Sequence, residues 1–321
     1  MTMDAPNKTP FFDLTSEQGL LRASIAVTLF IATIGIAFGV ASGSFSIVFD
    51  GVYSLVDASM SGLSLVVVKL ITSHTTTLHM SRKLRERFTM GFWHLEPMVL
   101  ALNGILLCSV AIYALINAVL SLLEGGRHLE FDIAIIYAVL TVIACVTIAM
   151  IEARANRKLG SDFVRMDVKG WIMSASITAA LLIAFCFGYS VQGTAWEWMS
   201  PYIDPAVLGL VCLVIIPLPL SVIRQALSEI FLVTPSDLKL HVDEVAKHFV
   251  ALHGLQSYRA YVAKVGRSRE IELFFIVPPD MGAKTIAEWD ALRDEVGNAI
   301  GGEGPDRWLT VVFTGDKEWA E

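Results

Sequence analysis

The chain of 321 residues is 55% hydrophobic and 17% charged, with a formal net charge of -7 at pH 7 and a mean hydropathy of +0.61. Soluble proteins carry about 25% charged residues, and the charge deficit lies in the first two-thirds of this chain, where long uncharged stretches recur. The composition excludes a secreted disulfide scaffold, a coiled coil, a disordered protein and a wholly soluble enzyme.

Six stretches are long enough to cross a bilayer, because a hydrocarbon core about 30 Å thick needs roughly 20 apolar helical residues. They are residues 23–42, 46–68, 98–123, 133–151, 171–191 and 206–223. The second stretch is the exception among them, since it contains Asp50 and Asp57. Pro217 and Pro219 in the sixth stretch predict a kink, because proline cannot donate a helical hydrogen bond.

Lysine and arginine accumulate in the short cytoplasmic loops of membrane proteins. In this chain they gather after the second and fourth stretches, as Lys69, Arg82, Lys83, Arg85, Arg87, Arg154, Arg157, Lys158, Arg165 and Lys169. Both termini are therefore expected in the cytoplasm, with the chain in the inner membrane if its source is a bacterium. The first stretch is too long for the apolar part of a cleaved signal, and no small-residue cleavage site follows it.

The last part of the chain has the mixed polarity of a soluble α+β domain. Residues 236–251 predict a helix with Ser236 as its N-cap and Val242, Val245, Ala246 and Phe249 on one face. Residues 258–265 and 270–277 alternate as strands around a turn at Gly266, followed by a helix over 284–300 and a strand over 308–313. Helices on one face of a small sheet are expected.

The predicted organisation has four parts: a tail of residues 1–20, a transmembrane region of 21–225, a linker of 226–235 and a cytoplasmic domain of 236–321. The last domain is acidic, so nucleic acid is not expected as a partner. The four cysteines form no close pair and are interpreted as packing residues. No hydrolase, nucleotide-binding or metalloprotease motif is present, which favours a transporter or structural membrane protein over an enzyme.

The carboxylates of the second stretch are the strongest functional signal. A carboxylate in the middle of a bilayer costs at least about 2.5 kcal/mol, so one that is retained usually faces a cavity or an ion route. Asp50, Tyr53 and Asp57 are spaced i, i+3 and i+7 and share one helical face with Ser54. A structural alternative for Asp50 is a hydrogen bond to a neighbouring helix near the membrane surface.

Four segments resemble the cation diffusion facilitator family. "SGSFSIVFDGVYSLVDASMSGLSL" is similar to the family's second span, with Tyr53 and Asp57 at the two ligand positions and Asp50 before them. "FTMGFWHLEPMVLALNG" is similar to the entry to the third span, "RKLGSDFVRMDVKGWIMSASITAALL" to that of the fifth, and "IDPAVLGLVCLVI" to the start of the sixth. The resemblance implies six transmembrane helices and a cytoplasmic αββαβ domain of ferredoxin or metallochaperone type.

The fifth span departs from the family pattern. The family places a His and, four residues later, an Asp there to complete a tetrahedral site, and the alignment on Asp167 puts Gly170 and Ser174 at those positions. Sliding the register by three residues puts Asp167 and Trp171 there instead. Neither register restores a zinc site.

The candidate ligands are therefore oxygen donors, namely Asp57, Tyr53, Asp50, Asp167 and Ser174, with Ser54 and Ser176 as possible additions. Oxygen donors suit harder cations than zinc. We expect a transported divalent cation (Mn, Fe, Mg or Zn), or alternatively Na⁺ or H⁺, and no permanently bound cofactor. The resemblance further implies exchange against protons and a homodimer formed through the cytoplasmic domain. Two other hypotheses remain, a non-transporting homologue that partners an active transporter and an integral membrane enzyme.

Overall fold

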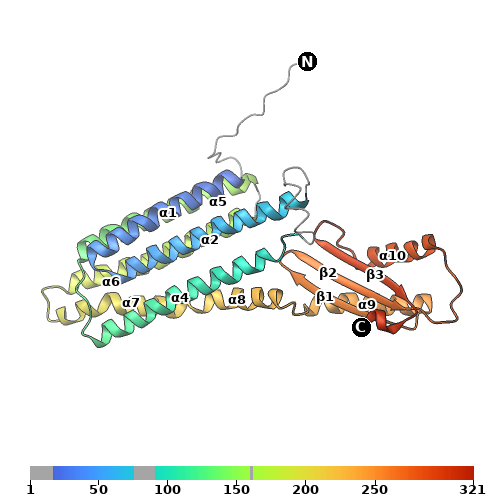
Figure 1. Cartoon of the computed structure of the whole chain (residues 1–321). Helices are drawn as coiled ribbons and strands as arrows, with labels where there is room; N and C mark the ends of the chain where they lie inside the picture. Colours follow the sequence, from blue (N-terminus) through green and yellow to red (C-terminus); the bar gives the residue numbers. More distant parts are fainter. Residues whose placement is uncertain (1–16, 76–90, 160–161) are drawn as a thin grey trace, which may run out of the picture. The chain divides into compact units, whose positions relative to one another are not determined.

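A computed structural model describes residues 17–75, 91–159 and 162–321 (Figure 1). Contacts divide the described residues into two compact units, one built from residues up to 63 and 103–221 and the other from 64–102 and 222–321. Three helices, α2 (Phe45–Thr75), α4 (Leu95–Leu123) and α8 (Pro217–Ile230), contribute residues to both units. Arg82, Lys83, Arg85 and Arg87, on which part of the orientation argument rests, lie outside the described residues, as does the tail up to residue 16.

The six expected spans are confirmed as helices. They are α1 (Glu17–Ser42), α2 (Phe45–Thr75), α4 (Leu95–Leu123), α5 (Phe131–Leu159), α6 (Asp162–Val191) and the pair α7 (Ser200–Ile215) and α8 (Pro217–Ile230). Within the part of the chain that the structure describes, six helical segments are long and apolar enough to cross a membrane. Each helix extends past its apolar stretch because polar residues at the ends continue the helical hydrogen bonding.

The predicted kink in the last span is confirmed as a break at Ile216. The helix stops at Ile215 and restarts at Pro217, and the Ile216 amide still donates to the carbonyl of Cys212 at 2.9 Å. Pro217 and Pro219 have no amide hydrogen, so the two following helical bonds cannot form. The break therefore follows directly from the sequence.

Helices α1 and α2 approach each other closely through glycine. A Cβ atom on Gly51 would lie 2.8 Å from the carbonyl oxygen of Ala32, and one on Gly39 would lie 2.6 Å from the amide nitrogen of Val48. In membranes, small residues allow helix backbones to meet at this distance. The glycines therefore fix the position of α2 against α1.

The start of α2 is held by a buried carboxylate from α7. Asp204, which is 1% exposed, accepts a hydrogen bond from the Ser44 hydroxyl at 2.6 Å and another from the Phe45 amide at 3.0 Å. The Ser46 hydroxyl also donates to the backbone carbonyl of Asp204 at 3.0 Å. Because the first amides of a helix have no partner within it, the Ser44 hydroxyl caps α2 by accepting from the Ile47 amide at 3.2 Å, and the Asp204 carboxylate extends this cap to the Phe45 amide.

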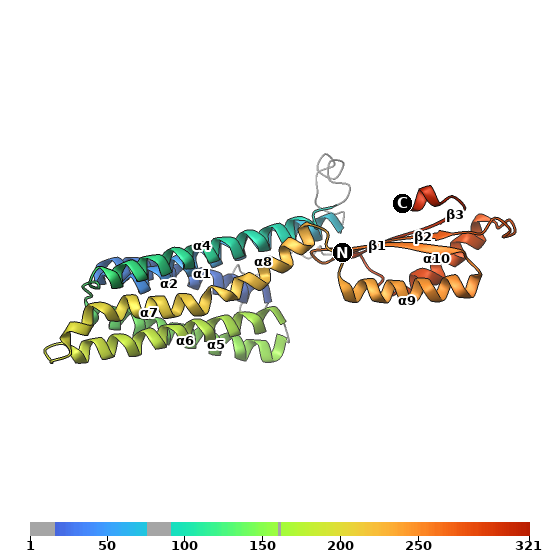
Figure 2. The ribbon, with the colours of Figure 1, turned by 90° about the horizontal axis from the view of Figure 1, so that it is seen from below.

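The C-terminal residues form a three-stranded sheet with two helices on one face (Figure 2). Strands β1 (Ser257–Val265) and β2 (Ser268–Ile276) are antiparallel, and β3 (Arg307–Thr314) lies parallel to β2. Helices α9 (Ser236–His253) and α10 (Ile286–Ile300) cover the face of the sheet that carries Leu273 and Phe275. The αββαβ order and the single covered face are confirmed, as is the turn at Gly266, whose φ is 59°.

The expected starts of both C-terminal helices need correction. The N-cap of α9 is Pro235 rather than Ser236, which is the first helical residue and makes no capping bond. Helix α10 begins at Ile286, two residues later than expected, because Thr285 and Glu288 form a capping box. The Thr285 hydroxyl accepts from the Glu288 amide while the Glu288 carboxylate accepts from the Thr285 amide, and this exchange fixes the helix start.

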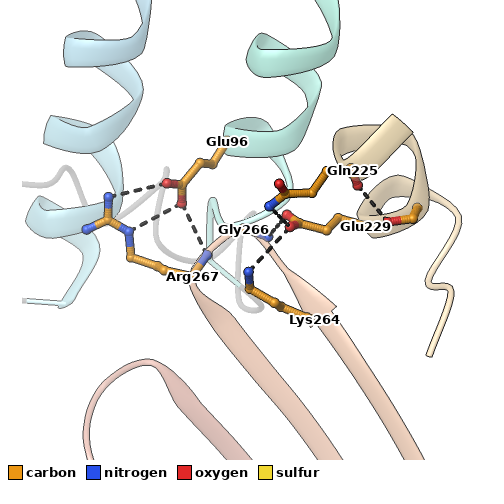
Figure 3. A network of polar contacts seen from close by, with 7 residues as sticks. Glu96, Gln225, Glu229, Lys264, Gly266 and Arg267 are labelled. Atoms are coloured by element: carbon orange, nitrogen blue, oxygen red, sulfur yellow. Dashed lines mark hydrogen bonds and ion pairs between the residues drawn. The ribbon is translucent and has the colours of Figure 1, made fainter. Parts of the chain in front are cut away.

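The turn between β1 and β2 is bound by two glutamates from helix ends, as Figure 3 shows. Glu229 near the end of α8 accepts from the Gly266 amide at 3.0 Å and pairs with Lys264 at 3.5 Å. Glu96 in the first turn of α4 pairs with Arg267 at 3.3 Å and accepts from its amide at the same distance. The glutamate at the entry to the expected third span therefore has a structural role within this unit.

Candidate functional site

A cavity of about 180 Å³ lies within the helical unit. Its walls come from α1, α2, α5, α6, α7 and the first turn of α8. The lining includes all five side chains that the sequence predicts as ligands: Asp50, Tyr53, Asp57, Asp167 and Ser174. Residues more than a hundred positions apart in the sequence therefore share one polar cavity in an otherwise apolar bundle.

Helix α2 supplies the first side of the cavity. Asp50, Tyr53 and Asp57 all line it, as expected from their spacing on one helical face, and Ser54 lies among them. Asp57 is the most open of the three, whereas Asp50 and Tyr53 are half-buried. The Tyr53 ring packs against Phe49, with ring centroids 5.6 Å apart, which holds the tyrosine in place.

Helix α6 supplies the opposite side. Asp167, Gly170, Trp171 and Ser174 all line the cavity, so the ligand positions of both possible registers face the same space. Ser176 does not line it: this residue lies in a separate apolar groove and its hydroxyl donates to the carbonyl of Ile172 at 2.8 Å. Ser176 is therefore removed from the candidate set, because it lies on another face of α6.

One sulfur atom also belongs to this cavity. Cys145 of α5 lines it, and its thiol lies 3.8 Å from the Ser174 hydroxyl, to which it donates a weak hydrogen bond. Cys145 is buried in a hydrophobic cluster, as the sequence interpretation of the cysteines expected, but its place beside the cavity was not anticipated. All four cysteines are free. The donor set of the cavity is therefore mainly oxygen with one thiol.

Two uncharged polar residues beside the predicted carboxylates were also missed. Asn103 of α4 is the side chain paired with Asp57, and its amide oxygen is buried without a hydrogen-bond partner. The Tyr137 hydroxyl of α5 lies beside Asp50 and is likewise buried without a regular partner. Both residues are uncharged, so a search for charged residues within the apolar stretches does not single them out.

Glu152 of α5 is a further acidic residue that the sequence could have indicated. It follows directly after the last residue of the apolar stretch 133–151, and it is only 2% exposed. Its carboxyl group lies within hydrogen-bonding reach of Asp167. Because the stretch was ended at the first charged residue, this carboxylate was assigned to the polar loop instead of the bundle.

The acidic groups are spread along the cavity rather than gathered at one point. Within residues 17–75, 91–159 and 162–321, no group of three or more His, Cys, Asp or Glu side chains is placed to hold a metal ion. A cation bound to one or two of these carboxylates would need tyrosine, serine or asparagine oxygens, or water, to complete its coordination. Such mixed shells suit hard cations, which keep several water ligands.

Comparison with known proteins gives a consistent assignment. The model of the cation efflux transmembrane domain matches residues 21–231. The metal cation efflux system protein CzcD of Cupriavidus metallidurans is 23% identical over 241 residues, which cover 74% of this chain and 69% of that protein. The cation efflux system protein CzcD of an Alcaligenes species matches over the same length with the same identity.

The family match spans the six apolar helices and every residue of the polar cavity named above. It also agrees with the four motifs found in the sequence. The chain is an integral, multi-pass membrane protein and belongs to the cation efflux family, also called the cation diffusion facilitators.

Proposed function

We propose that this protein exports a divalent metal cation from the cytoplasm in exchange for protons, with Asp57 as the central carboxylate of the site. The observation that carries the proposal is the convergence of Asp50, Tyr53, Asp57, Asp167 and Ser174 on one cavity. Polar groups cost free energy within a bilayer, so a cavity that gathers carboxylates from two helices is typical of an ion route. The names of the two relatives, both metal or cation efflux proteins, support the same function.

The donor atoms favour a hard cation such as Mn²⁺, Fe²⁺ or Mg²⁺. Four of the five proposed ligands offer carboxylate or hydroxyl oxygens of Asp and Ser, and the fifth is the phenolic oxygen of Tyr53. Zinc prefers nitrogen and sulfur ligands in a tetrahedral arrangement. The thiol of Cys145 adds one soft donor beside Ser174, so zinc belongs in any test of selectivity.

Exchange against protons follows from the chemistry of the ligands. A carboxylate binds either a metal ion or a proton, so the two compete for the same oxygen atoms. When the cavity opens to the side with more protons, protonation releases the cation. The carboxylates of Asp50, Asp57 and Asp167 are the groups in this cavity that can perform the exchange.

The expected orientation and assembly belong to the same proposal. Both termini lie in the cytoplasm, and two copies associate through the C-terminal domain. Phe275, Phe313 and Trp289 pack within the core of that domain, so they are not free for a second copy. Tyr261 and Phe274 pack edge to face on the side of the sheet opposite α9 and α10, where the Tyr261 hydroxyl donates to the carbonyl of Ala320 at 2.8 Å and Tyr261 is still 47% exposed. These two aromatics are the better candidates for contact between copies.

The function is tested by reconstituting the full chain in lipid vesicles and measuring uptake of Mn²⁺, Fe²⁺, Mg²⁺, Co²⁺ and Zn²⁺. Asp57→Asn should abolish uptake, because the neutral amide supplies neither the negative charge that holds the cation nor the oxygen that exchanges a proton. Asp132→Asn is the matched control, since Asp132 is an exposed aspartate at the start of α5. Robust transport that survives Asp57→Asn would contradict the assignment of the site, and uptake without a change in internal pH would contradict proton exchange.

A second candidate function is that of a non-transporting homologue that partners an active transporter. The observation that favours it is the presence of Gly170 and Ser174 at cavity positions where the family pattern expects two ligands. Absence of flux for every cation in vesicles of the unaltered protein, together with co-purification of a second transporter, would favour this function over export.

A further inference from the structure

Glu152 forms a pair of carboxyl groups with Asp167, and the proposed transport site uses Asp167 but leaves Glu152 unexplained. Glu152 lies on α5 and Asp167 on α6, and their side chains are within hydrogen-bonding reach of each other. Glu152 is 2% exposed. Asp167 lines the cavity, whereas Glu152 lies behind it.

A chain of hydrogen bonds holds Glu152 in position. The Trp171 indole nitrogen donates to the Ser24 hydroxyl at 2.9 Å, and Ser24 in turn hydrogen-bonds the Glu152 carboxyl group. Since the serine oxygen accepts from the indole, its own hydrogen is available for the glutamate. Ser24 and Trp171 are both buried, so three helices, α1, α5 and α6, fix this side chain.

Each carboxyl group keeps one buried oxygen without a hydrogen-bond donor. These atoms are Oε2 of Glu152 and Oδ2 of Asp167. None of the ion pairs between described residues involves either side chain. Buried polar atoms are nearly always hydrogen-bonded, so these two acceptor oxygens call for a partner that the neighbouring side chains do not supply.

The partner that best fits two neighbouring carboxylate oxygens carries a positive charge. Two carboxylates in contact repel each other strongly in a medium of low dielectric constant, so a buried pair needs a positive charge between its members. The two free atoms are both carboxylate oxygens, and neither has a hydrogen-bond partner. A hard divalent cation, which binds through one or two carboxylates and keeps several waters, fits this donor set.

We propose that Glu152 and Asp167, together with the Ser24 hydroxyl, form a second divalent-cation site beside the cavity. The proposal rests on the function given above and adds a site that precedes Asp57. The pair lies near the connection between α5 and α6, flanked by Arg154, Arg157 and Lys158, which is the end expected to face the cytoplasm. Asp167 belongs to both the pair and the cavity wall, so a cation held there has direct access to the cavity.

Glu152→Gln separates the cation site from the packing of the helices. The amide oxygen still accepts from Ser24 and the amide nitrogen can donate to the free oxygen of Asp167, so the folded state keeps its shape and loses the repulsion. The variant should therefore be at least as stable as the unaltered protein without metal. It should lose the stabilisation by Mn²⁺ that comes from this site, because a ligand stabilises only the state that binds it.

The first experiment measures Mn²⁺ binding to the full chain in lipid nanodiscs by electron paramagnetic resonance of the free ion. Asp57→Asn should keep one saturable site, and the Asp57→Asn/Glu152→Gln double variant should lose it. Glu124→Gln is the matched control, since Glu124 is exposed and lies just beyond the end of α4. Asp167→Asn in the Asp57→Asn background should behave as the double variant does, which covers the case in which Glu152→Gln fails to give a monodisperse protein.

The second experiment measures Mn²⁺ uptake into vesicles. Glu152→Gln should raise the half-saturating concentration at least about tenfold, which is the lower end of the loss caused even by groups that only support a metal ligand. Two results would overturn the second site: loss of all Mn²⁺ binding in Asp57→Asn, or an unchanged half-saturating concentration in Glu152→Gln. A proton shared by the two carboxyl groups would then be the positive charge between them. The proposed function fails separately, if Asp57→Asn itself transports.

Discussion

Removal of the Asp204 carboxylate tests whether the cap of α2 depends on hydrogen bonding. In Asp204→Ala the buried Phe45 amide and the Ser44 hydroxyl both lose the acceptor to which they now donate at 3.0 and 2.6 Å. Loss of a helix N-cap costs about 0.5–2 kcal/mol, and a hydrogen bond to a charged group contributes about 1.5–3 kcal/mol. We expect Asp204→Ala to lower the free energy of unfolding by about 2–4 kcal/mol, since the two contributions are not fully additive.

Asp204→Asn should lose much less, for a geometric reason. Its amide oxygen can accept from the Phe45 amide while its amide nitrogen donates to the Ser44 oxygen, so both partners stay paired and only the charge is lost. Asp132→Ala is the control, because Asp132 is exposed in the first turn of α5 and its interaction with the helix dipole contributes less than about 1 kcal/mol.

The assay is unfolding of the purified full chain in mixed detergent micelles by titration with a denaturing detergent, followed by tryptophan fluorescence. The expected order of stability is unaltered protein, Asp204→Asn, then Asp204→Ala. Equal losses for the alanine and asparagine variants would refute the hydrogen-bond argument and point to charge instead. A loss in Asp204→Ala no larger than in Asp132→Ala would show that the hydrogen bonds to Asp204 do not stabilise the helix start.

Two further predictions concern packing and pH. Gly51→Ala should destabilise the protein by about 1–3 kcal/mol, because its Cβ would lie 2.8 Å from a backbone oxygen of α1. Gly62→Ala in the same helix is the control, since its Cβ would meet nothing within 4 Å. This variant should be neutral or stabilising in the same unfolding titration. Burial raises the pKa of Asp243, but hydrogen bonds from Lys239 and Tyr258 outweigh it and hold that pKa below its usual value of 3.8. The carboxylate therefore stabilises the fold above pH 3.8 and loses this effect as the pH falls through the lowered pKa. The difference in melting temperature between the unaltered protein and Asp243→Asn should shrink on acidification. A difference that stays constant with pH would contradict the pairing of Asp243 with Lys239 and Tyr258.

The helices and the candidate ligands of α2 were predictable from the sequence because the bilayer makes each departure from apolarity expensive. A continuous apolar run of the right length leaves few alternatives to a membrane helix. Asp50 and Asp57 were visible as charges within such a run, and their shared face followed from helical spacing alone. For the same reason the Pro217 and Pro219 break was visible in advance.

The other half of the cavity was less predictable, since it depends on packing between distant helices. Asn103 and Tyr137 are uncharged and carry no periodic signal, yet their buried polar atoms lie beside Asp57 and Asp50. The fifth helix offered two registers, and the structure places the positions of both on one cavity wall. In the C-terminal domain, the parallel pairing of β2 with β3 is a non-local choice that local strand patterns do not encode.

The break at Ile216 lets the last span bend where it lines the cavity. Pro217 and Pro219 leave the carbonyl oxygens of Leu213 and Ile215 without the helical amides that would resist bending. The residues on either side, Ile215 and Leu218, both line the cavity. The angle between the two helical segments is therefore held less by backbone hydrogen bonds than in an unbroken helix. The width of the cavity at this point then depends more on side-chain contacts, among them the Cys108 thiol, which donates to the Ile216 carbonyl at 3.7 Å.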